Sequence, residues 1–177
     1  NKRRAQLLTV KPNKAHEILA ELEAHFDMHI ITQNVDDLHE RAGSNKVIHL
    51  HGELLKVRSI SNEDFVIDWK HDLILGDLDI EGNQLRPHIV WFGESVPMIE
   101  PAAELVAQAD MLVVIGTSLQ VYPAAGLVDC TRPGVPVFVI DPNTPSTQNK
   151  KVTYITQPAT VGVPLWIKTH LGITLPE

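Results

Sequence analysis

The stretch Met111-Leu-Val-Val-Ile-Gly-Thr-Ser118 decides the fold of this chain. Its first part, residues 111–115, is continuously apolar and predicts a strand buried on both faces, after which a polar loop begins at a glycine. The stretch 135–143, Val-Pro-Val-Phe-Val-Ile-Asp-Pro-Asn, has the same form. Segments with helical spacing lie around these stretches, so the pattern predicts an α/β fold with a parallel, doubly wound sheet.

The remaining apolar segments continue this alternation of helices and strands. We expect helices at 3–8, 12–26, 99–109, 123–130 and 164–171, and further strands at 28–31 and 154–156. The apolar face of the second helix comprises Ala15, Ile18, Leu19, Leu22 and Phe26. Residues 59–84 are polar and irregular, which is typical of an inserted small subdomain.

The composition limits the class of protein. With 177 residues, of which 44% are hydrophobic, the chain is long enough for one domain with its own core. The single cysteine, Cys130, cannot form an internal disulfide, and neither a signal peptide nor a membrane-spanning apolar run is visible, which favours the cytoplasm. The net charge of −7 provides no basic face, so we expect neither a nucleic-acid nor a membrane partner.

Polar loops follow three of the expected strands. They occupy residues 32–36, 116–118 and 141–143. In doubly wound sheets ligands bind beyond the carboxyl ends of the strands, so the loops predict a shared nucleotide-binding crevice. Thr117 and Ser118 offer hydroxyl groups to phosphate or ribose, although a helix cap explains them equally well. Asp141 suits a ribose diol, and an Asp-Pro turn is an equal alternative.

A histidine followed by glycine, His51-Gly52, is the candidate general base. Histidine titrates near neutral pH, and the glycine leaves room for a substrate beside the ring. The chain contains nine histidines, and spacing alone does not choose between His49 and His51. No serine-hydrolase elbow or zinc-protease motif is present.

Taken together, these segments resemble the sirtuin family of NAD-dependent protein lysine deacylases. The matching segments, in the family's order, are Ile31-Thr-Gln-Asn-Val-Asp-Asp-Leu-His39, His49-Leu-His-Gly52, Arg86-Pro-His-Ile-Val-Trp-Phe-Gly-Glu94, Gly116-Thr-Ser-Leu-Gln-Val-Tyr-Pro-Ala-Ala-Gly126 and Ile140-Asp-Pro-Asn143. Each alone is weak, whereas the set is specific. The resemblance is strongest to bacterial members of the demalonylase/desuccinylase-type branch, and it implies a Rossmann-like large domain.

The resemblance also implies a role for each matching residue. His51 would be the base, and Asn34 would lie near the water that is used later in the reaction. NAD would be bound by Gln33, Asn34, Val35, Asp36, Gly116, Thr117, Ser118, Asp141, Pro142, Asn143 and Ala159. The acyl-lysine protein or peptide would be bound by Arg3, Val90, Phe92, Gly93 and Val121.

The implied reaction consumes NAD as a co-substrate. The acyl oxygen attacks the ribose carbon that carries nicotinamide, His51 removes a proton from a ribose hydroxyl, and water completes transfer of the acyl group to ADP-ribose. Two alternatives stay open. One is a non-catalytic nucleotide-binding domain of the same fold, which leaves His51 and residues 90–94 unexplained. The other is ADP-ribosyl transfer or NAD hydrolysis at the same site.

The sequence departs from the family pattern in the small domain, which we expect at 57–84. Most sirtuins bind a structural zinc there with two Cys-x-x-Cys pairs, and this stretch has no cysteine. We therefore expect no zinc, and a small domain that is held by apolar contacts of Phe65, Ile67 and Trp69.

A second departure concerns the start of the chain. The family begins with a central strand and a Gly-Ala-Gly-x-Ser loop that binds the pyrophosphate, and neither is present. Because the chain also begins at Asn1 rather than methionine, we expect a catalytic domain that lacks this part and is impaired by itself. Arg3 aligns with the last position of a Tyr-x-x-Arg motif that binds acyl carboxylates in the acidic-acyl branch. A solvated helix arginine is the alternative.

Overall fold

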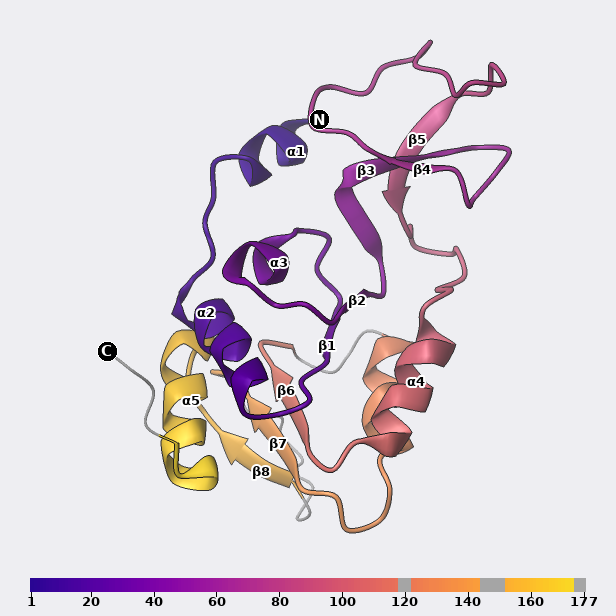
Figure 1. The fold of residues 1–177 in the computed structure, drawn as a ribbon. Helices are drawn as coiled ribbons and strands as arrows, with labels where there is room; N and C mark the ends of the chain where they lie inside the picture. The colour runs from indigo at the N-terminus through magenta and orange to yellow at the C-terminus, as the bar shows by residue number, and fades with distance from the viewer. Residues whose placement is uncertain (118–121, 144–151, 174–177) are drawn as a thin grey trace.

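The predicted parallel strands form two small sheets in the computed structural model (Figure 1), which describes residues 1–117, 122–143 and 152–173. One sheet has the order β6-β7-β8 and the other pairs β1 with β2, in parallel register throughout. The strands are β1 (Ile30–Thr32), β2 (Val47–His49), β6 (Leu112–Ile115), β7 (Val137–Ile140) and β8 (Val152–Ile155). The doubly wound parallel architecture is confirmed, but its strands are divided between two sheets rather than one.

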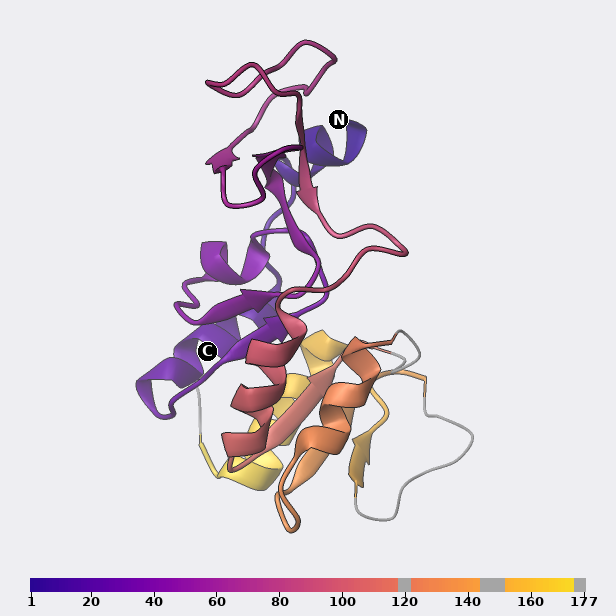
Figure 2. The same cartoon turned by 90° about the vertical axis from the view of Figure 1, so that its right-hand side faces the viewer.

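Helices cover both faces of the β6-β7-β8 sheet (Figures 1 and 2). On one face α5 (Ala159–Trp166) and α2 (Lys14–Glu21) pack around Ile140, which is fully buried. On the other face α4 (Ile99–Gln108) packs against the 3₁₀ helix Ala124–Cys130. This two-sided cover is the reason that the strands are apolar without alternation.

The predicted boundaries differ from the structure at three places. Phe26 lies outside the buried helix face and is 42% exposed, because α2 and the following 3₁₀ turn end at Ala24. The segment 123–130 forms a 3₁₀ helix rather than an α-helix. The closing helix begins at Ala159 and contains Pro164 in its interior, so the proline did not mark its start.

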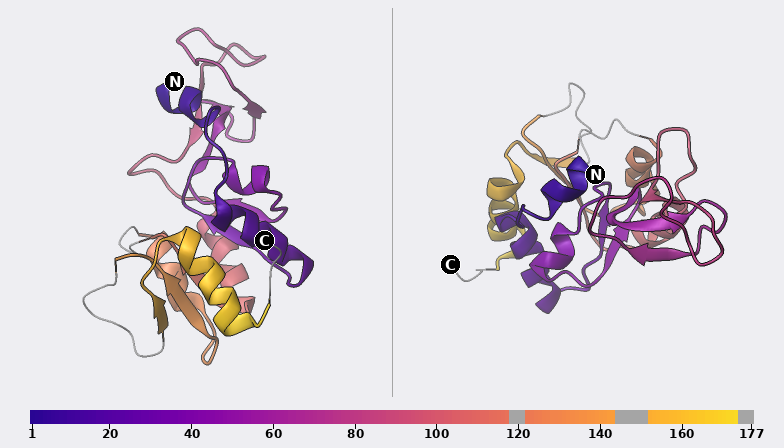
Figure 3. Two further views of the ribbon diagram at one scale, coloured as in Figure 1. Left: turned by 90° about the vertical axis from the view of Figure 1, so that its left-hand side faces the viewer. Right: turned by 90° about the horizontal axis from the view of Figure 1, so that it is seen from above.

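A three-stranded antiparallel sheet stands apart from the parallel strands, beside α1 (Lys2–Leu7) (Figures 2 and 3). Its order is β4-β3-β5, from β3 (Gly52–Ser59), β4 (Val66–Asp68) and β5 (Leu85–Ile89). The buried Arg4 connects α1 to this sheet, since its Nε donates to the Leu54 carbonyl oxygen at 2.9 Å. We call this sheet with its loops the small unit.

Hydrogen bonds, rather than an apolar core, hold the long loop of the small unit. Ile67 is 38% exposed, and Phe65 and Trp69 are only half-buried, so none of the three belongs to a buried apolar cluster, and their expected role in holding the small domain stays a prediction. Asp79 accepts from the Asn83 and Glu81 amides at 2.8 and 2.9 Å. A loop this rich in Asp, Asn and Gly has too few apolar atoms to form a core, so side chain-to-backbone bonds take that role.

No helix among the described residues is long and apolar enough to cross a membrane.

Candidate active site

A cavity of about 1030 Å³ separates the two parallel sheets. All of β1 and all of β6 line it, together with parts of α2, α4 and α5. Successive side chains of a strand point to opposite faces, so a cavity that touches every residue of a strand borders its edge rather than one face. The four residues of β6 are accordingly only half-buried, whereas those of β7, which has a neighbour on both sides, are buried.

The loops after β1 and β6 meet at this cavity. Gln33 and Asn34 from the first loop line it, as do Gly116 and Thr117 from the second. The Gln33 Nε2 donates to Thr117 Oγ1 at 3.4 Å, which is a long hydrogen bond across the two loops. Gly116 has a positive φ of 63°, a conformation that glycine adopts without strain. These four residues form the part of the predicted nucleotide crevice that the structure assembles.

The ring of His51 is oriented by the same loop. Its Nδ1 lies 3.0 Å from the Gln33 carbonyl oxygen. A carbonyl oxygen only accepts hydrogen bonds, so Nδ1 carries the hydrogen and Nε2 presents its lone pair. A half-buried histidine in this tautomer is suited to act as a general base through Nε2.

His49 is engaged at both ring nitrogens, which separates it from His51. Its Nε2 lies 2.7 Å from Glu40 Oε1, and its Nδ1 lies 3.4 Å from the Asn34 carbonyl oxygen. The side chain is 9% exposed. Since neither nitrogen of His49 is left for a substrate, the geometry favours His51, a choice that spacing left open.

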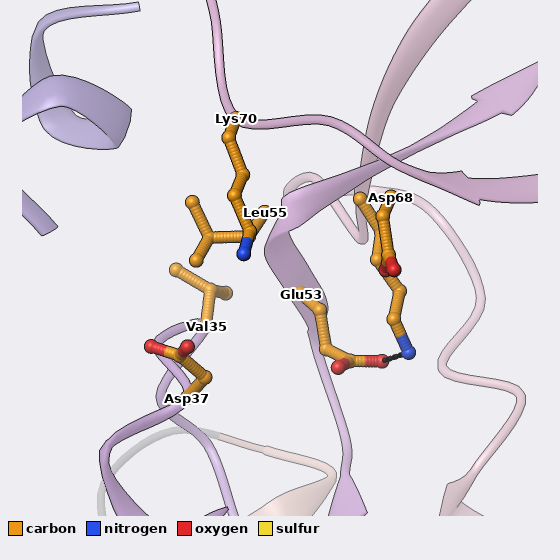
Figure 4. A pocket seen from close by; sticks show the side chains of 7 residues that line it. Val35, Asp37, Glu53, Leu55, Asp68 and Lys70 are labelled. Atoms are coloured by element: carbon orange, nitrogen blue, oxygen red, sulfur yellow. Dashed lines mark hydrogen bonds and ion pairs between the residues drawn. The ribbon is translucent and has the colours of Figure 1, made fainter. Parts of the chain in front are cut away.

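Val35 and Asp36 do not line the large cavity. Val35 borders a second hollow of about 170 Å³, where it faces Leu55 of β3 and the Glu53–Lys56 ion pair (Figure 4). Asp36 Oδ1 accepts from the Leu38 amide at 3.1 Å and so shapes the start of α3 (Leu38–Ala42). Asp36 thus stabilises the turn before α3, and its contact with a ribose stays a prediction.

The loop after β7 also lies outside the large cavity's lining. Asp141 Oδ1 accepts from the Asn143 amide at 2.7 Å, which is the Asp-Pro turn that the sequence allowed as an alternative. Pro142 and Asn143 are exposed. Ala159, at the start of α5, does line the cavity. Ser118 and Val121 lie outside the described residues.

The expected peptide-binding segment follows β5 directly and is attached to the base. The Val90 amide donates to the His51 carbonyl oxygen at 3.0 Å. Phe92 is fully exposed, and Gly93 has a φ of 91°. Gly52 allows this approach, because a Cβ at position 52 would overlap the His88 carbonyl oxygen. The close packing of β5 against β3 thus sets the position of residues 90–93 relative to His51.

Arg3 and Arg4 have opposite environments on the short helix α1. Arg3 is exposed, whereas Arg4 is 2% exposed and donates to the carbonyl oxygens of Leu54 and His71. Sequence reasoning passed over Arg4, because a pair of adjacent arginines reads as a solvated helix surface. Arg4 anchors α1 to the small unit and so determines where Arg3 is presented.

The donor set of the small unit does not fit a structural zinc site. Residues 57–84 contain no cysteine, and the described residues contain no group of three or more His, Cys, Asp or Glu side chains that could hold a metal ion. Structural zinc requires four such donors, usually with thiolates among them.

The polar loops at the carboxyl ends of the parallel strands β1 and β6, with His51 held by the Gln33 carbonyl oxygen, have the arrangement of a ligand site in the doubly wound α/β class of folds. The sequence profile of the Sir2 family matches residues 1–123, and the chain belongs to this family. The predicted sirtuin resemblance is thereby confirmed.

Curated relatives and solved structures agree with this assignment. The chain is 58% identical over 142 residues to an NAD-dependent protein deacylase of Helicobacter pylori (strain ATCC 700392 / 26695), covering 80% of this chain and 62% of that protein. It is 54% identical over 153 residues to an NAD-dependent protein deacylase of Aggregatibacter actinomycetemcomitans, covering 86% and 73%. The crystal structure of a Sir2 homolog in complex with NAD superposes with a TM-score of 0.82 at 38% identity, covering 94% of this chain and 67% of that chain. A Sir2 structure bound to a propionylated peptide has a TM-score of 0.79 at 31% identity, covering 96% and 75%.

The chain thus spans less than two thirds of the length of the Helicobacter pylori relatives, 62% and 61%.

Proposed function

We propose that this chain carries the catalytic core of an NAD-dependent protein lysine deacylase. Two linked hydrogen bonds support this most directly: His51 Nδ1 donates to the Gln33 carbonyl oxygen, and Gln33 Nε2 donates to Thr117 Oγ1. These contacts join the base to both loops of the cavity. The relatives named NAD-dependent protein deacylase and the NAD-bound Sir2 homolog support the same reading.

His51 acts as the general base. The Gln33 carbonyl oxygen accepts the Nδ1 hydrogen, stabilises the imidazolium that forms and keeps Nε2 directed at the substrate. The base thereby removes a proton from a sugar hydroxyl, whose oxygen becomes the acyl acceptor. Asn34, exposed at the cavity, is suited to orient a water molecule or an amide oxygen.

NAD would supply the electrophilic ribose carbon, and its two parts would leave as nicotinamide and O-acyl-ADP-ribose. The residues that would hold it include Gln33, Asn34, Gly116, Thr117 and Ala159, which line the cavity. Val35 and Asp36, which the sirtuin resemblance adds, lie outside this lining. Ser118 and the loop 141–143 would bind the adenosine end.

The second substrate would be an acylated-lysine protein or peptide. Val90, Phe92 and Gly93 would pair with its backbone as an added strand, and Val121 would line the acyl-lysine tunnel. The propionylated-peptide and p53-peptide complexes of Sir2 structures support a peptide substrate. The exposed Arg3 would bind an acidic acyl group, because a guanidinium pairs with a carboxylate through two hydrogen bonds.

The domain arrangement follows from the cavity between the sheets. We propose that the large domain of the intact enzyme contains a further parallel strand that pairs with the free edges of β1 and β6. The half-buried apolar residues of β6 and the width of the cavity support this position. The small unit, which includes residues 57–84 and extends from Gly52 to Ile89, would be the small domain.

The test uses the full-length protein with an acyl-lysine peptide and NAD, and it measures nicotinamide release. His51→Ala should abolish peptide-dependent release, whereas His25→Ala, a change at an exposed histidine that is not among the residues lining the cavity, should leave it intact. Persisting release in His51→Ala would remove the base from its role. The products separate the alternatives: O-acyl-ADP-ribose indicates deacylation, free ADP-ribose indicates NAD hydrolysis, labelled protein indicates ADP-ribosyl transfer, and binding without turnover indicates a non-catalytic domain.

A further inference from the structure

The segment that follows β5 turns back on itself and is closed by Glu94. The Glu94 amide donates to the Trp91 carbonyl oxygen at 3.0 Å, and the Trp91 amide donates to Glu94 Oε2 at 3.0 Å. The Glu94 carboxylate thus closes the turn Trp91–Gly93 from its far end. We call these residues with Glu94 the 91–94 turn.

Apolar burial does not hold this turn in place. Trp91 is 54% exposed and Phe92 is fully exposed. A Cβ at Gly93 would meet no atom within 4 Å. Because the side chains of the turn have little packing, its conformation depends on polar contacts, and these contacts converge on one carboxylate.

Arg86 of β5 binds that carboxylate with both of its terminal nitrogens. Nη1 donates to Glu94 Oε1 at 2.8 Å and Nη2 donates to Oε2 at 3.1 Å. Nη2 also lies 3.4 Å from the Ile89 carbonyl oxygen. A paired, charge-assisted contact of this kind fixes orientation as well as distance. Arg86 thereby connects the turn to the strand that pairs with β3.

A second arginine, Arg58, adds positive charge close to the Glu94 carboxylate. Arg58 of β3 is 8% exposed, and its Nη2 lies 3.8 Å from Glu94 Oε2 and 3.9 Å from Glu63 Oε1. The hydrogen bonds from Arg86, followed by the Trp91 amide, hold the pKa of Glu94 below its ordinary value. Glu94 is therefore a carboxylate at neutral pH and remains a full acceptor for the turn.

The turn is also connected to the catalytic histidine. Val90, which precedes the turn, donates from its amide to the His51 carbonyl oxygen at 3.0 Å. The β3–β5 pairing places Gly52 opposite Ile89 and Arg58 opposite Arg86. The base and the turn are thus attached to the same two paired strands, at neighbouring positions.

We propose that Glu94 and Arg86 are positioning residues, which keep the 91–94 turn closed and in fixed register with His51 so that the backbone of an acyl-lysine peptide can pair with it. The proposal rests on the deacylase function proposed above and deepens its substrate side. The two residues act on peptide binding and not on the NAD end of the site, because their polar contacts within the described part of the chain lie in the small unit and in residues 89–94.

The experiment compares Glu94→Gln with the unaltered full-length enzyme. Glutamine keeps the size and one acceptor oxygen but loses the charge and the paired contact with Arg86. We expect the KM for the acyl-lysine peptide to rise about tenfold, while kcat and the KM for NAD stay within about twofold, as for the loss of uniform binding. Chymotrypsin should also cleave the free enzyme after Trp91 or Phe92 several-fold faster, as expected when the turn opens more often.

Glu23→Gln is the matched control. Its carboxylate likewise holds a loop, accepting from the Asn45 amide at 2.9 Å and from Asn45 Nδ2 at 2.7 Å, but it lies outside the small unit and the cavity lining. It should leave the peptide KM and the cleavage after Trp91 unchanged. Glu94→Asp keeps the charge on a shorter side chain and should give an intermediate KM.

Two different failures can be told apart. If the unaltered enzyme turns over peptide and Glu94→Gln has the same peptide KM, or loses kcat and both KM values together, the positioning role is refuted and the deacylase function stands. If the unaltered enzyme shows no peptide-dependent turnover, the deacylase function is refuted and the role of the turn in peptide binding is refuted with it.

Discussion

Replacing Gly52 by alanine tests whether the close approach of β5 to His51 is what requires a glycine. Gly52 has a φ of 79°, and its added Cβ would overlap the His88 carbonyl oxygen and lie 2.9 Å from the His88 carbonyl carbon. The left-handed backbone costs an alanine about 1–2 kcal/mol. Overlap with backbone atoms, which cannot rotate away, costs about 1–3 kcal/mol more.

Together these costs predict that Gly52→Ala lowers the free energy of unfolding by about 2–5 kcal/mol. For a chain of this size, this corresponds to a fall in melting temperature of about 5–15 °C. Activity of the folded fraction should fall further, because displacement of the backbone by about 1 Å can cost about a hundredfold in rate. Circular dichroism gives the melting temperature, and nicotinamide release below it gives the rate.

Gly82→Ala is the control for this prediction, because it shares the positive φ of Gly52 without the overlap. Gly82 has a similar φ of 85°, but a Cβ there would meet no atom within 4 Å. Gly82→Ala should lose only the backbone contribution to the free energy of unfolding, about 1–2 kcal/mol. It should keep its activity. Equal losses in the two variants would refute the argument from overlap.

Two further predictions concern packing and pH. Gly162→Ala places a Cβ against Cγ2 of the fully buried Ile140 and 3.3 Å from Gln157 Cβ. The cost of overpacking outweighs the gain in helix propensity, so the free energy of unfolding should fall by about 1 kcal/mol, and the melting temperature should fall with it. The rate of nicotinamide release per folded molecule should stay unchanged in this variant. A rise in its melting temperature would contradict the prediction. For Asp79, a hydrogen bond from Ser59, followed by bonds from Asn83 and Glu81, lowers the pKa to about 2. A lowered carboxyl pKa stabilises the folded state above about pH 4, and this stabilisation is lost as pH falls from about 4 to 2. The melting temperature of Asp79→Asn should therefore lie below that of the unaltered protein at pH 6 and meet it near pH 2; a difference that is constant with pH would exclude a charge effect.

Hydrogen bonds from polar side chains to the backbone stabilise the small unit. Asp79 and Gln84 bind loop amides or carbonyl oxygens, and Arg4 connects the unit to α1. These contacts stabilise a loop that has exposed apolar side chains, including Leu75 at 91% and Ile80 at 90%. Substitutions that remove the polar contacts should consequently loosen this unit before the parallel sheets.

The sequence by itself determined the class of fold and the family, because both depend on local pattern. Continuous apolar runs at 111–115 and 135–140 become parallel strands that helices cover on both sides, so their type could be read without knowing their neighbours. The identity and order of the quoted motifs were enough to indicate the sirtuin family, which the profile match over residues 1–123 confirms.

The tertiary structure decided what depends on contacts between distant segments. His51 and His49 differ only in what each ring nitrogen meets, and Gln33 reaches a residue 84 positions away at Thr117. The separation of the parallel strands around a cavity, and the closure of the 91–94 turn by Glu94, likewise follow from packing between elements. Residue type and spacing specify which groups are present, whereas the direction in which a side chain points depends on the whole folded chain.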